Sequence, residues 1–416
     1  MNRERKIFKY PRLTPLWIAV FIDIIGFSLI LPMTGFFQEL YNTSTIMIGL
    51  VLSVNAMFGF IFGPILGKLS DNFGRRPLLL ISQFGTFIGF VLLAFSNSLE
   101  LLIFSRIIDG VFGGNFPIAK AIVSDVVPPK DRGIQMANIG IAHVLASLIG
   151  PGLGGILFSI GGIFLPGMFA AGLSALTMII TVIVLQESWP KEKRIKSIEV
   201  SINNKERILK NKNSIFFLTL FGFHSVSFMT MMSSISFFGV LVLKLEVLEI
   251  SFIMVISGIV RTTIRFTLFK PTLKKFGESN AIRIGLTMFL ICFFLVGFSP
   301  NALIFFILLM IVSFAASLTR GPLNSKISQT VSPKVQGKIN GYGSSLDSFA
   351  QIVGPLIGTF TLQFFMPFWL GIAIGSISFI PFLMAFQKIE EKKYVPSVDE
   401  EYIYYDKKIY MEEEEN

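Results

Sequence analysis

Long apolar segments alternate with short polar ones along most of the chain. Twelve segments are apolar almost throughout, at approximately 14–36, 45–66, 77–96, 99–119, 134–157, 163–185, 214–240, 250–269, 284–299, 302–319, 340–361 and 366–386. About 20 apolar residues in a helix cross a hydrocarbon core of roughly 30 Å, whereas strands of a membrane barrel would alternate apolar and polar residues. The pattern therefore predicts an all-α integral membrane protein with twelve transmembrane helices.

The composition agrees with this pattern. Of the 416 residues, 52% are hydrophobic and only 15% are charged, and the mean hydropathy is +0.70. Soluble globular domains contain about 25% charged residues. The single cysteine, Cys292, excludes a disulfide framework within the chain and is expected to be a small buried apolar residue.

The distribution of Lys and Arg predicts how the helices cross the membrane, because cytoplasmic loops retain positive residues. Of the 36 Lys and Arg residues, Lys244 alone falls in the loops on one side, and those inside the spans are Arg106, Arg261 and Arg265. The rest flank the opposite side, which predicts a multi-pass protein of the cell membrane with both termini in the cytoplasm. Because these residues are spread over separate loops, the net charge of +10 does not indicate nucleic-acid binding.

The chain contains two copies of one plan of six spans. A shift of about half the chain aligns Pro117 with Pro322 and the GPGLGG element at 150–155 with GPLIG at 354–358. Parallel repeats of this kind are typical of transporters whose halves rock about a central site. The predicted units are a cytoplasmic N-terminal segment at 1–13, a six-helix bundle at 14–185, a cytoplasmic linker at 186–213, a second six-helix bundle at 214–386 and a charged cytoplasmic tail at 387–416.

Two motifs of the first half carry a family resemblance. The segment GKLSDNFGRRP joins the second and third spans and contains, in order, Gly67, Leu69, Asp71, Gly74, Arg75 and Arg76. The second motif, in the fifth span, consists of Gly150, Pro151, Gly154 and Gly155. With these motifs the chain resembles the major facilitator superfamily, and within it the twelve-helix drug:proton antiporters that include the tetracycline efflux proteins. It departs from their pattern at Asp109, where the family has Gln, and at Thr34, where the family has Pro.

The resemblance implies the major facilitator fold, in which two pseudo-symmetric six-helix bundles span the membrane. It also implies a transporter rather than an enzyme, working without a cofactor or a metal. The loop motif would then be a conformational latch, in which Arg75 and Arg76 bridge to Asp125 on the cytoplasmic face and stabilise the outward-open state. The alternative is a positively charged turn with no role in switching.

Asp23 is the first candidate for a proton carrier. It lies about nine residues into the first span, roughly 13 Å along the helix axis at 1.5 Å per residue. An ionised carboxylate at that depth costs a few kcal/mol, and protonation removes the cost. A carboxylate that faces each side of the membrane in turn would carry a proton inwards. The alternative is a structural Asp paired with a helix terminus or a nearby Arg.

Two more pairs are candidates for proton coupling. Arg106 and Asp109 lie three residues apart in the fourth span, so they can pair on one helix face, either as an exchangeable pair or as a static ion pair. His143 and Asp347 each lie eight residues before the proline of the repeated Gly-Pro element, so they occupy equivalent positions in the two halves. Either one of them takes part in proton release, or both are polar residues of a wet vestibule.

Three residues of the second half are candidates for contact with the substrate. Arg261 and Arg265 lie one turn apart in the eighth span, where they attract an anionic substrate or pair with carboxylates such as Asp347. His224, in the seventh span, is a weaker candidate because a buried histidine is more often a hydrogen-bonded packing residue.

The resulting hypothesis is a proton-coupled secondary transporter that exports small amphipathic molecules or drugs by alternating access, as a functional monomer in the lipid bilayer. A gradient must supply the energy, because the sequence contains no nucleotide-binding motif. The same fold would also suit a facilitator or an organic-anion transporter that clamps its substrate with Arg261, Arg265 and Arg106. A third interpretation is a membrane scaffold or receptor that transports nothing.

Overall fold

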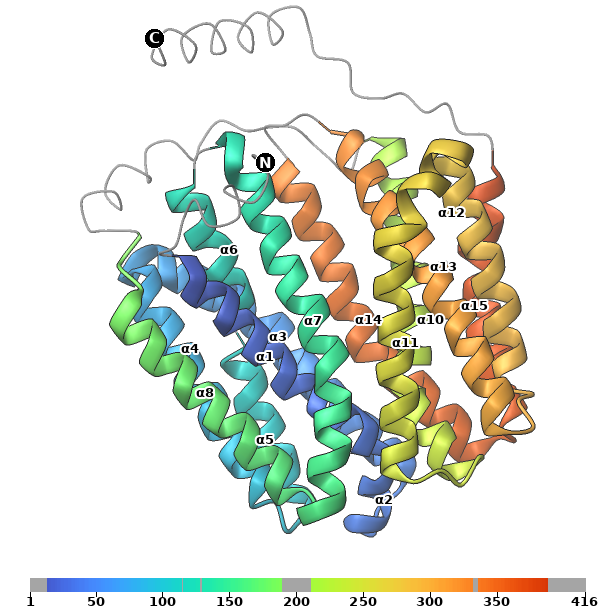
Figure 1. Ribbon diagram of the computed structural model, residues 1–416, viewed down its shortest axis with the longest axis horizontal. Helices are drawn as coiled ribbons and strands as arrows, with labels where there is room; N and C mark the ends of the chain where they lie inside the picture. The colour runs from blue at the N-terminus through green and yellow to red at the C-terminus, as the bar shows by residue number, and fades with distance from the viewer. Residues whose placement is uncertain (1–12, 114, 128, 189–210, 332–335, 388–416) are drawn as a thin grey trace, which may run out of the picture.

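The computed structural model describes residues 13–113, 115–127, 129–188, 211–331 and 336–387. The side chains of a few helical residues, among them His143 and Arg265, lie outside that description. All the regular structure in these ranges is helical (Figure 1).

The helices fall into two groups along the chain. The first half comprises α1 Thr14–Ile30, the 3-10 helix η3 Leu31–Phe36, α2 Phe37–Leu40, α3 Thr45–Phe73, α4 Arg75–Ala94, α5 Leu99–Val111, α6 Asn115–Val126, α7 Pro129–Gly161 and α8 Phe164–Val184. The second half comprises α10 Lys212–Leu241, α11 Val247–Thr267, α12 Phe269–Val296, α13 Ala302–Gln329, α14 Gln336–Phe364 and α15 Phe368–Phe386.

Polar side chains fix where several helices begin. Ser44, Ser98 and Asn301 occupy the N-cap positions of α3, α5 and α13, and each accepts a hydrogen bond from a backbone N–H of the first turn. Between α3 and α4 the chain turns at Gly74, whose φ of 107° suits a residue without a side chain.

The membrane fold expected from the apolar pattern is confirmed. Eleven helical segments of the described chain are long and apolar enough to cross a membrane. The predicted eleventh span corresponds to α14, which has 29 residues and is more polar than the others because it carries Asp347 and several Ser and Gly residues. The fold is thus an all-α arrangement of membrane-length helices.

Two predicted spans end too early. The fourth continues to Val126, with a break between α5 and α6, and the tenth continues to Gln329. Consequently Lys120 and Arg320, which the apolar windows place outside the spans, lie inside membrane-length helices. The windows stop where charged residues begin, but a membrane helix can continue past a charged residue that pairs with another group or faces the interior of the bundle.

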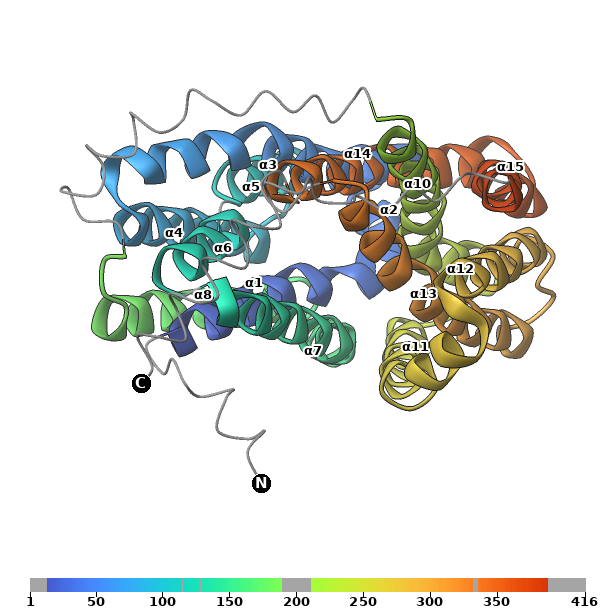
Figure 2. The same ribbon diagram turned by 90° about the horizontal axis from the view of Figure 1, so that it is seen from above.

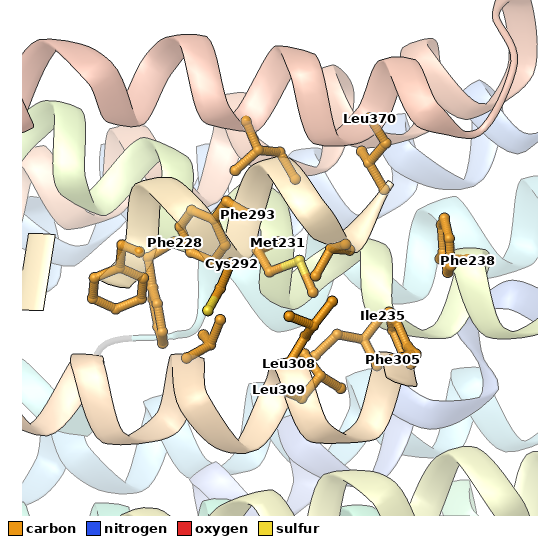
Figure 3. Close-up of a cluster of buried hydrophobic side chains, with 14 of the residues drawn as sticks. Phe228, Met231, Ile235, Phe238, Cys292, Phe293, Phe305, Leu308, Leu309 and Leu370 are labelled. Atoms are coloured by element: carbon orange, nitrogen blue, oxygen red, sulfur yellow. The ribbon is translucent and has the colours of Figure 1, made fainter. Parts of the chain in front are cut away.

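The two halves stand side by side, with α3 against α14 and α7 against α11 (Figures 1 and 2). Each half has a hydrophobic core of its own. The largest cluster of the second half contains Phe228, Met231, Phe293 and Cys292, which is buried as expected (Figure 3).

The halves are joined at one end of the molecule, which we call the Tyr41 end because Tyr41 lies there between α2 and α3. Ser53 Oγ donates to the carbonyl of Ile352 at 2.6 Å, and the backbone N–H of Ile46 donates to Gln363 Oε1 at 2.8 Å. Two further inter-half hydrogen bonds join Ser236 to the backbone of Pro32 and Gly35. A buried apolar cluster there also includes Phe237 and Val247 of the second half beside residues of α1 and α3.

The opposite end, where α3 passes into α4 at Arg75, is called the Arg75 end. A Cβ atom built on Gly63 or Gly67 of α3, or on Gly341 or Gly343 of α14, would meet nothing within 4 Å. By contrast, Gly49 of α3 lies against Thr359 of α14 near the Tyr41 end. The halves are therefore closed at the Tyr41 end and separate towards the Arg75 end.

Candidate functional site

The loop motif forms a cluster of charges at the Arg75 end of the first half. The Arg75 side chain, only 9% exposed, lies 2.6 Å from Asp71 and 2.9 Å from Asp125. Its Nη1 also donates to Ser70 Oγ at 2.7 Å. The expected bridge to Asp125 therefore exists at Arg75. Arg76 instead donates from Nη2 to the carbonyl of Val182 at 2.6 Å.

Two members of this cluster were not expected from the sequence. Glu187, just after α8, accepts hydrogen bonds from the backbone N–H groups of Arg75 and Arg76 at 2.9 and 3.3 Å. Ser188 donates to Asp125 at 3.2 Å. The cluster ties α3, α4, α6 and the end of α8 together within the first half.

A related arrangement recurs in the second half with reversed charge. Gly277, with φ of 75°, interrupts α12 as Gly74 separates α3 from α4. The next residue is Glu278 where the first half has Arg75, and its carboxylate accepts from Ser325 at 2.9 Å and from Gln329 at 3.2 Å. The two turns are built alike, but the residue after the glycine is basic in the first half and acidic in the second.

Replacing Arg75 with glutamine is expected to destabilise the first half by about 3–5 kcal/mol, because Asp125 would remain buried without its cation. The measurement is thermal or denaturant unfolding of the detergent-solubilised protein. Arg76→Gln is the matched control and should cost only about 1 kcal/mol, because it removes one hydrogen bond to a carbonyl. Equal losses for the two variants would contradict a structural role specific to Arg75.

A second polar centre lies inside the first half, between α3 and α5. Arg106 Nη1 lies 3.2 Å from Asp109 Oδ2, so the pair expected from their spacing is formed. Asn55 of α3 donates to the same carboxylate oxygen at 2.9 Å and to the carbonyl of Arg106 at 3.2 Å. The guanidinium also lies over the ring of Phe90, 5.7 Å from its centroid.

Asp23 of α1 lies beside this centre and is partly exposed. Its carboxyl lies close to the Asn115 side chain, although no hydrogen bond of good geometry joins them, and it experiences the charge of Asp109. Asn115 is buried, yet neither of its side-chain polar atoms has a hydrogen-bond partner in the described structure, and the same holds for Arg106 Nη2. Buried polar groups without partners are rare and need an explanation such as water, an ion or a ligand.

A third polar centre lies in the second half, on α10, α13 and α14. Arg320 Nη2 lies 2.5 Å from Asp347 Oδ2, and Ser225 Oγ donates to Asp347 Oδ1 at 2.8 Å. The sequence indicated Asp347 but missed Arg320, because the apolar window ended one residue before it. The proposed equivalence of Asp347 with His143 is not decided, since the His143 side chain lies outside the described residues.

The other candidates for substrate contact are less accessible or not described. His224 is 1% exposed, lies 3.4 Å from the Thr319 hydroxyl and meets the ring of Phe289 edge-on at 4.8 Å. These contacts match the packing role considered for it. Arg261 is partly exposed in α11, and its backbone carbonyl accepts from Ser317 at 3.3 Å. The side chain of Arg265 lies outside the description.

The Gly-Pro motif of α7 permits close contact with two neighbouring helices. A Cβ on Gly154 would collide with the backbone of Leu29 in α1, and a Cβ on Gly155 would collide with Ser251 in α11 of the other half. Gly150 lies equally close to Ser28, and Pro151 lies within the helix. The motif therefore shapes both the core of the first half and its interface with the second.

Metal binding finds no support in the described ranges, where no group of three or more His, Cys, Asp or Glu side chains could hold an ion. The three polar centres consist of ion pairs, amides and hydroxyls. Such groups can bind charged or polar molecules and exchange protons.

Comparisons with known proteins agree with this architecture. The Tetracycline resistance protein, class H, of Pasteurella multocida is 27% identical over 386 residues, which cover 87% of this chain and 92% of that protein. The crystal structure of the human organic anion transporter MFSD10 superposes with a TM-score of 0.69 at 21% identity, covering 92% of this chain and 100% of that chain. A D-xylose-proton symporter gives a TM-score of 0.75 at 15% identity, covering 93% and 100%.

The family model described as Major Facilitator Superfamily matches residues 16–269 and 266–402, which together include nearly all of the helices described above. Relatives and structural neighbours are transporters and not enzymes. This chain is a multi-pass membrane protein that belongs to the Major Facilitator Superfamily.

Proposed function

We propose that the chain is a proton-coupled secondary transporter that exports small amphipathic molecules by alternating access. The observation that carries the proposal is the position of Asp23, a partly exposed carboxyl inside the first half, beside buried Asn115 and Arg106 atoms that lack partners. An acidic group within the membrane is costly when ionised, so its retention favours a role in moving protons. The similarity to a tetracycline resistance protein supports export as the direction.

The separation of the halves towards the Arg75 end supports a cycle of alternating access. We assign this end to the cytoplasm, because it carries most of the Lys and Arg residues, and we place the protein in the cell membrane as a functional monomer. Substrate then enters from the cytoplasm while the Tyr41 end is closed. Rocking of the halves would break the contacts of α3 with α14 at the Tyr41 end and bring their Arg75 ends together.

The proton is the driving ion in this proposal. Asp23 takes up a proton when the site faces outwards and releases it when the site faces inwards, where the substrate is loaded. Moving one charge down 100 mV supplies about 2.3 kcal/mol, which sustains a substrate gradient of roughly fiftyfold. The Arg106–Asp109 pair keeps its neighbourhood nearly neutral, so the charge state of Asp23 decides the net charge of the centre.

The test uses everted membrane vesicles that contain the full chain. On energisation, vesicles should accumulate ethidium or fluorescein, two dyes of opposite charge, and a protonophore should release the accumulated dye. Vesicles without the protein provide the background. Accumulation that persists after the proton gradient collapses would overturn proton coupling, and failure to move either dye would count against export of amphipathic molecules.

A further inference from the structure

Two cations from opposite halves lie near a single carboxylate. Arg320 of α13 pairs with Asp347 of α14 at 2.5 Å, and Ser225 holds the other carboxylate oxygen. Lys120 comes from α6 of the first half, and the charge of Asp347 acts on its ammonium group. Lys120 forms no ion pair with a described residue. The cluster therefore carries two positive charges and one negative charge.

The cluster is accessible and lies at a similar depth in both halves. The side chains of Arg320 and Asp347 are 34% and 23% exposed, and Lys120 is half-buried. At 1.5 Å per residue these residues lie roughly 9–17 Å along their helices from the Arg75 end. The halves separate towards this end, and Lys120 belongs to the first half whereas Arg320 belongs to the second.

Aromatic rings accompany both cations. Lys120 Nζ lies 4.2 Å from the ring centroid of Phe116. The Arg320 guanidinium lies 5.8 Å from the ring centroid of Phe221 and 5.9 Å from that of Phe228. Phenyl rings beside a fixed charge favour ligands that combine an apolar, flat body with an ionic group.

Among the described residues, the other charges near the cluster leave its positive excess in place. Arg106 and Asp109 neutralise each other in their own pair. His224 experiences the charge of Arg320, but it is fully buried among aromatic rings and Thr319. The Asp347 carboxylate is already engaged by Arg320 and Ser225. An incoming anion therefore finds a Lys120 ammonium without an ion-pair partner among the described residues, and a partly exposed Arg320 guanidinium.

We propose that Lys120 and Arg320 bind the acidic group of an amphipathic organic anion, while the partly exposed ring of Phe116 contacts its apolar body. The inference rests on the proposed function and names the substrate class of the transporter: aromatic carboxylates or sulfonates. Asp347 is the internal anion that the substrate's acidic group partly replaces at Arg320.

The test measures equilibrium binding to the purified full chain in detergent, without any gradient. The probes are 2-naphthoate, 2-naphthylmethylammonium and neutral 2-naphthalenemethanol, which share one ring system and differ in charge. The wild-type protein should bind 2-naphthoate at least tenfold more tightly than the other two. Lys120→Gln should weaken 2-naphthoate about tenfold and leave the alcohol unchanged. Lys212→Gln, at the exposed start of α10, is the matched control and should change nothing.

The variant Asp347→Asn distinguishes an anion-binding site from a cation-binding site most clearly. An anion site should gain affinity for 2-naphthoate by severalfold, because the competing carboxylate is gone, whereas a cation site centred on Asp347 should lose affinity for the ammonium probe. Preference for the ammonium probe, loss of 2-naphthoate binding in Asp347→Asn, or unchanged binding in Lys120→Gln would each overturn the proposal. Binding of none of the probes by the folded wild-type protein would overturn it as well.

These outcomes are independent of proton coupling. If 2-naphthoate binds as described but dye accumulation in vesicles does not depend on the proton gradient, the proposed substrate class is supported and proton coupling is contradicted. If dye accumulation depends on the proton gradient but the protein does not prefer 2-naphthoate to the other probes, proton coupling is supported and the proposed substrate class is contradicted.

Discussion

Replacing Asp23 with asparagine is expected to abolish uphill export and to leave downhill substrate exchange intact. Asparagine has nearly the same shape and retains the contact with Asn115, but it cannot bind and release a proton. In energised vesicles the wild-type protein should carry the dye beyond its own electrochemical equilibrium, by up to roughly fiftyfold per proton at 100 mV, whereas the variant should stop at that equilibrium. Exchange of labelled for unlabelled dye needs no proton and should continue.

Asp23→Glu is the control for this substitution. It keeps a titratable group and should retain some uphill export, reduced because the longer side chain no longer fits beside Asn115. Uphill export by Asp23→Asn would remove Asp23 from the mechanism. Loss of both export and exchange in Asp23→Asn would assign it a structural role.

Replacing Gly155 with valine is expected to open the Tyr41 end and reduce transport below one tenth of the wild-type rate. A Cβ at this position collides with Ser251 and lies 3.3 Å from the carbonyl of Val247, both in α11 of the other half. Ser251 is held in place, since its hydroxyl donates to the same carbonyl at 2.7 Å. Overpacking of this kind costs about 1–3 kcal/mol, and here the cost falls on the closed Tyr41 end.

Spin labels provide the measurement. Cys292 is first replaced with alanine, and labels are attached through Ser44→Cys and Met366→Cys, at exposed positions of the two halves near the Tyr41 end. The distances between the labels should lengthen in Gly155→Val. Gly172→Val is the control, because a Cβ at Gly172 meets nothing within 4 Å. Unchanged distances in Gly155→Val would show that the contact does not hold the halves together.

The apolar pattern predicted the fold well because each span must match the thickness of the bilayer. Its errors occurred where charges lie inside the membrane. The fourth span was expected to end before Lys120, and the tenth before Arg320, yet both helices continue for several residues. A sliding apolar window cannot identify such residues, since their partners come from other helices: Asp347 for Arg320, for example.

The break between α5 and α6 has a local cause that was visible in the sequence. Gly113 and Pro117 flank this break, where the helix ends at Val111 and begins again at Asn115. What the sequence did not indicate is that the break leaves Asn115 buried without partners beside Asp23.

The loop motif shows which of its contacts can be predicted from the sequence and which cannot. The motif predicted a bridge from its arginines to Asp125, and Arg75 forms that bridge in the structure. The roles of Glu187 and Ser188 depend on how α8 returns to the Arg75 end, more than 100 residues later. No spacing rule covers that distance, so only the folded chain reveals these partners.

The alternative functions predict different effects of the same substitutions. A facilitator needs no proton carrier, so Asp23→Asn would leave its downhill transport unaffected. A scaffold or receptor would show no dependence of transport on any of the variants, because it would move neither dye. Coupling through Asp23 is thus the claim that separates the proposed exporter from both.

Proton release on substrate binding tests that claim most directly. The purified full chain, in weakly buffered detergent solution, is mixed with the dye that the vesicle assay shows to be exported, and the pH change is recorded with an indicator. The account predicts release of up to one proton per molecule bound by the wild-type protein and none by Asp23→Asn. Binding of the dye to the wild-type protein without any proton release, at every pH between about 5 and 8, would contradict it.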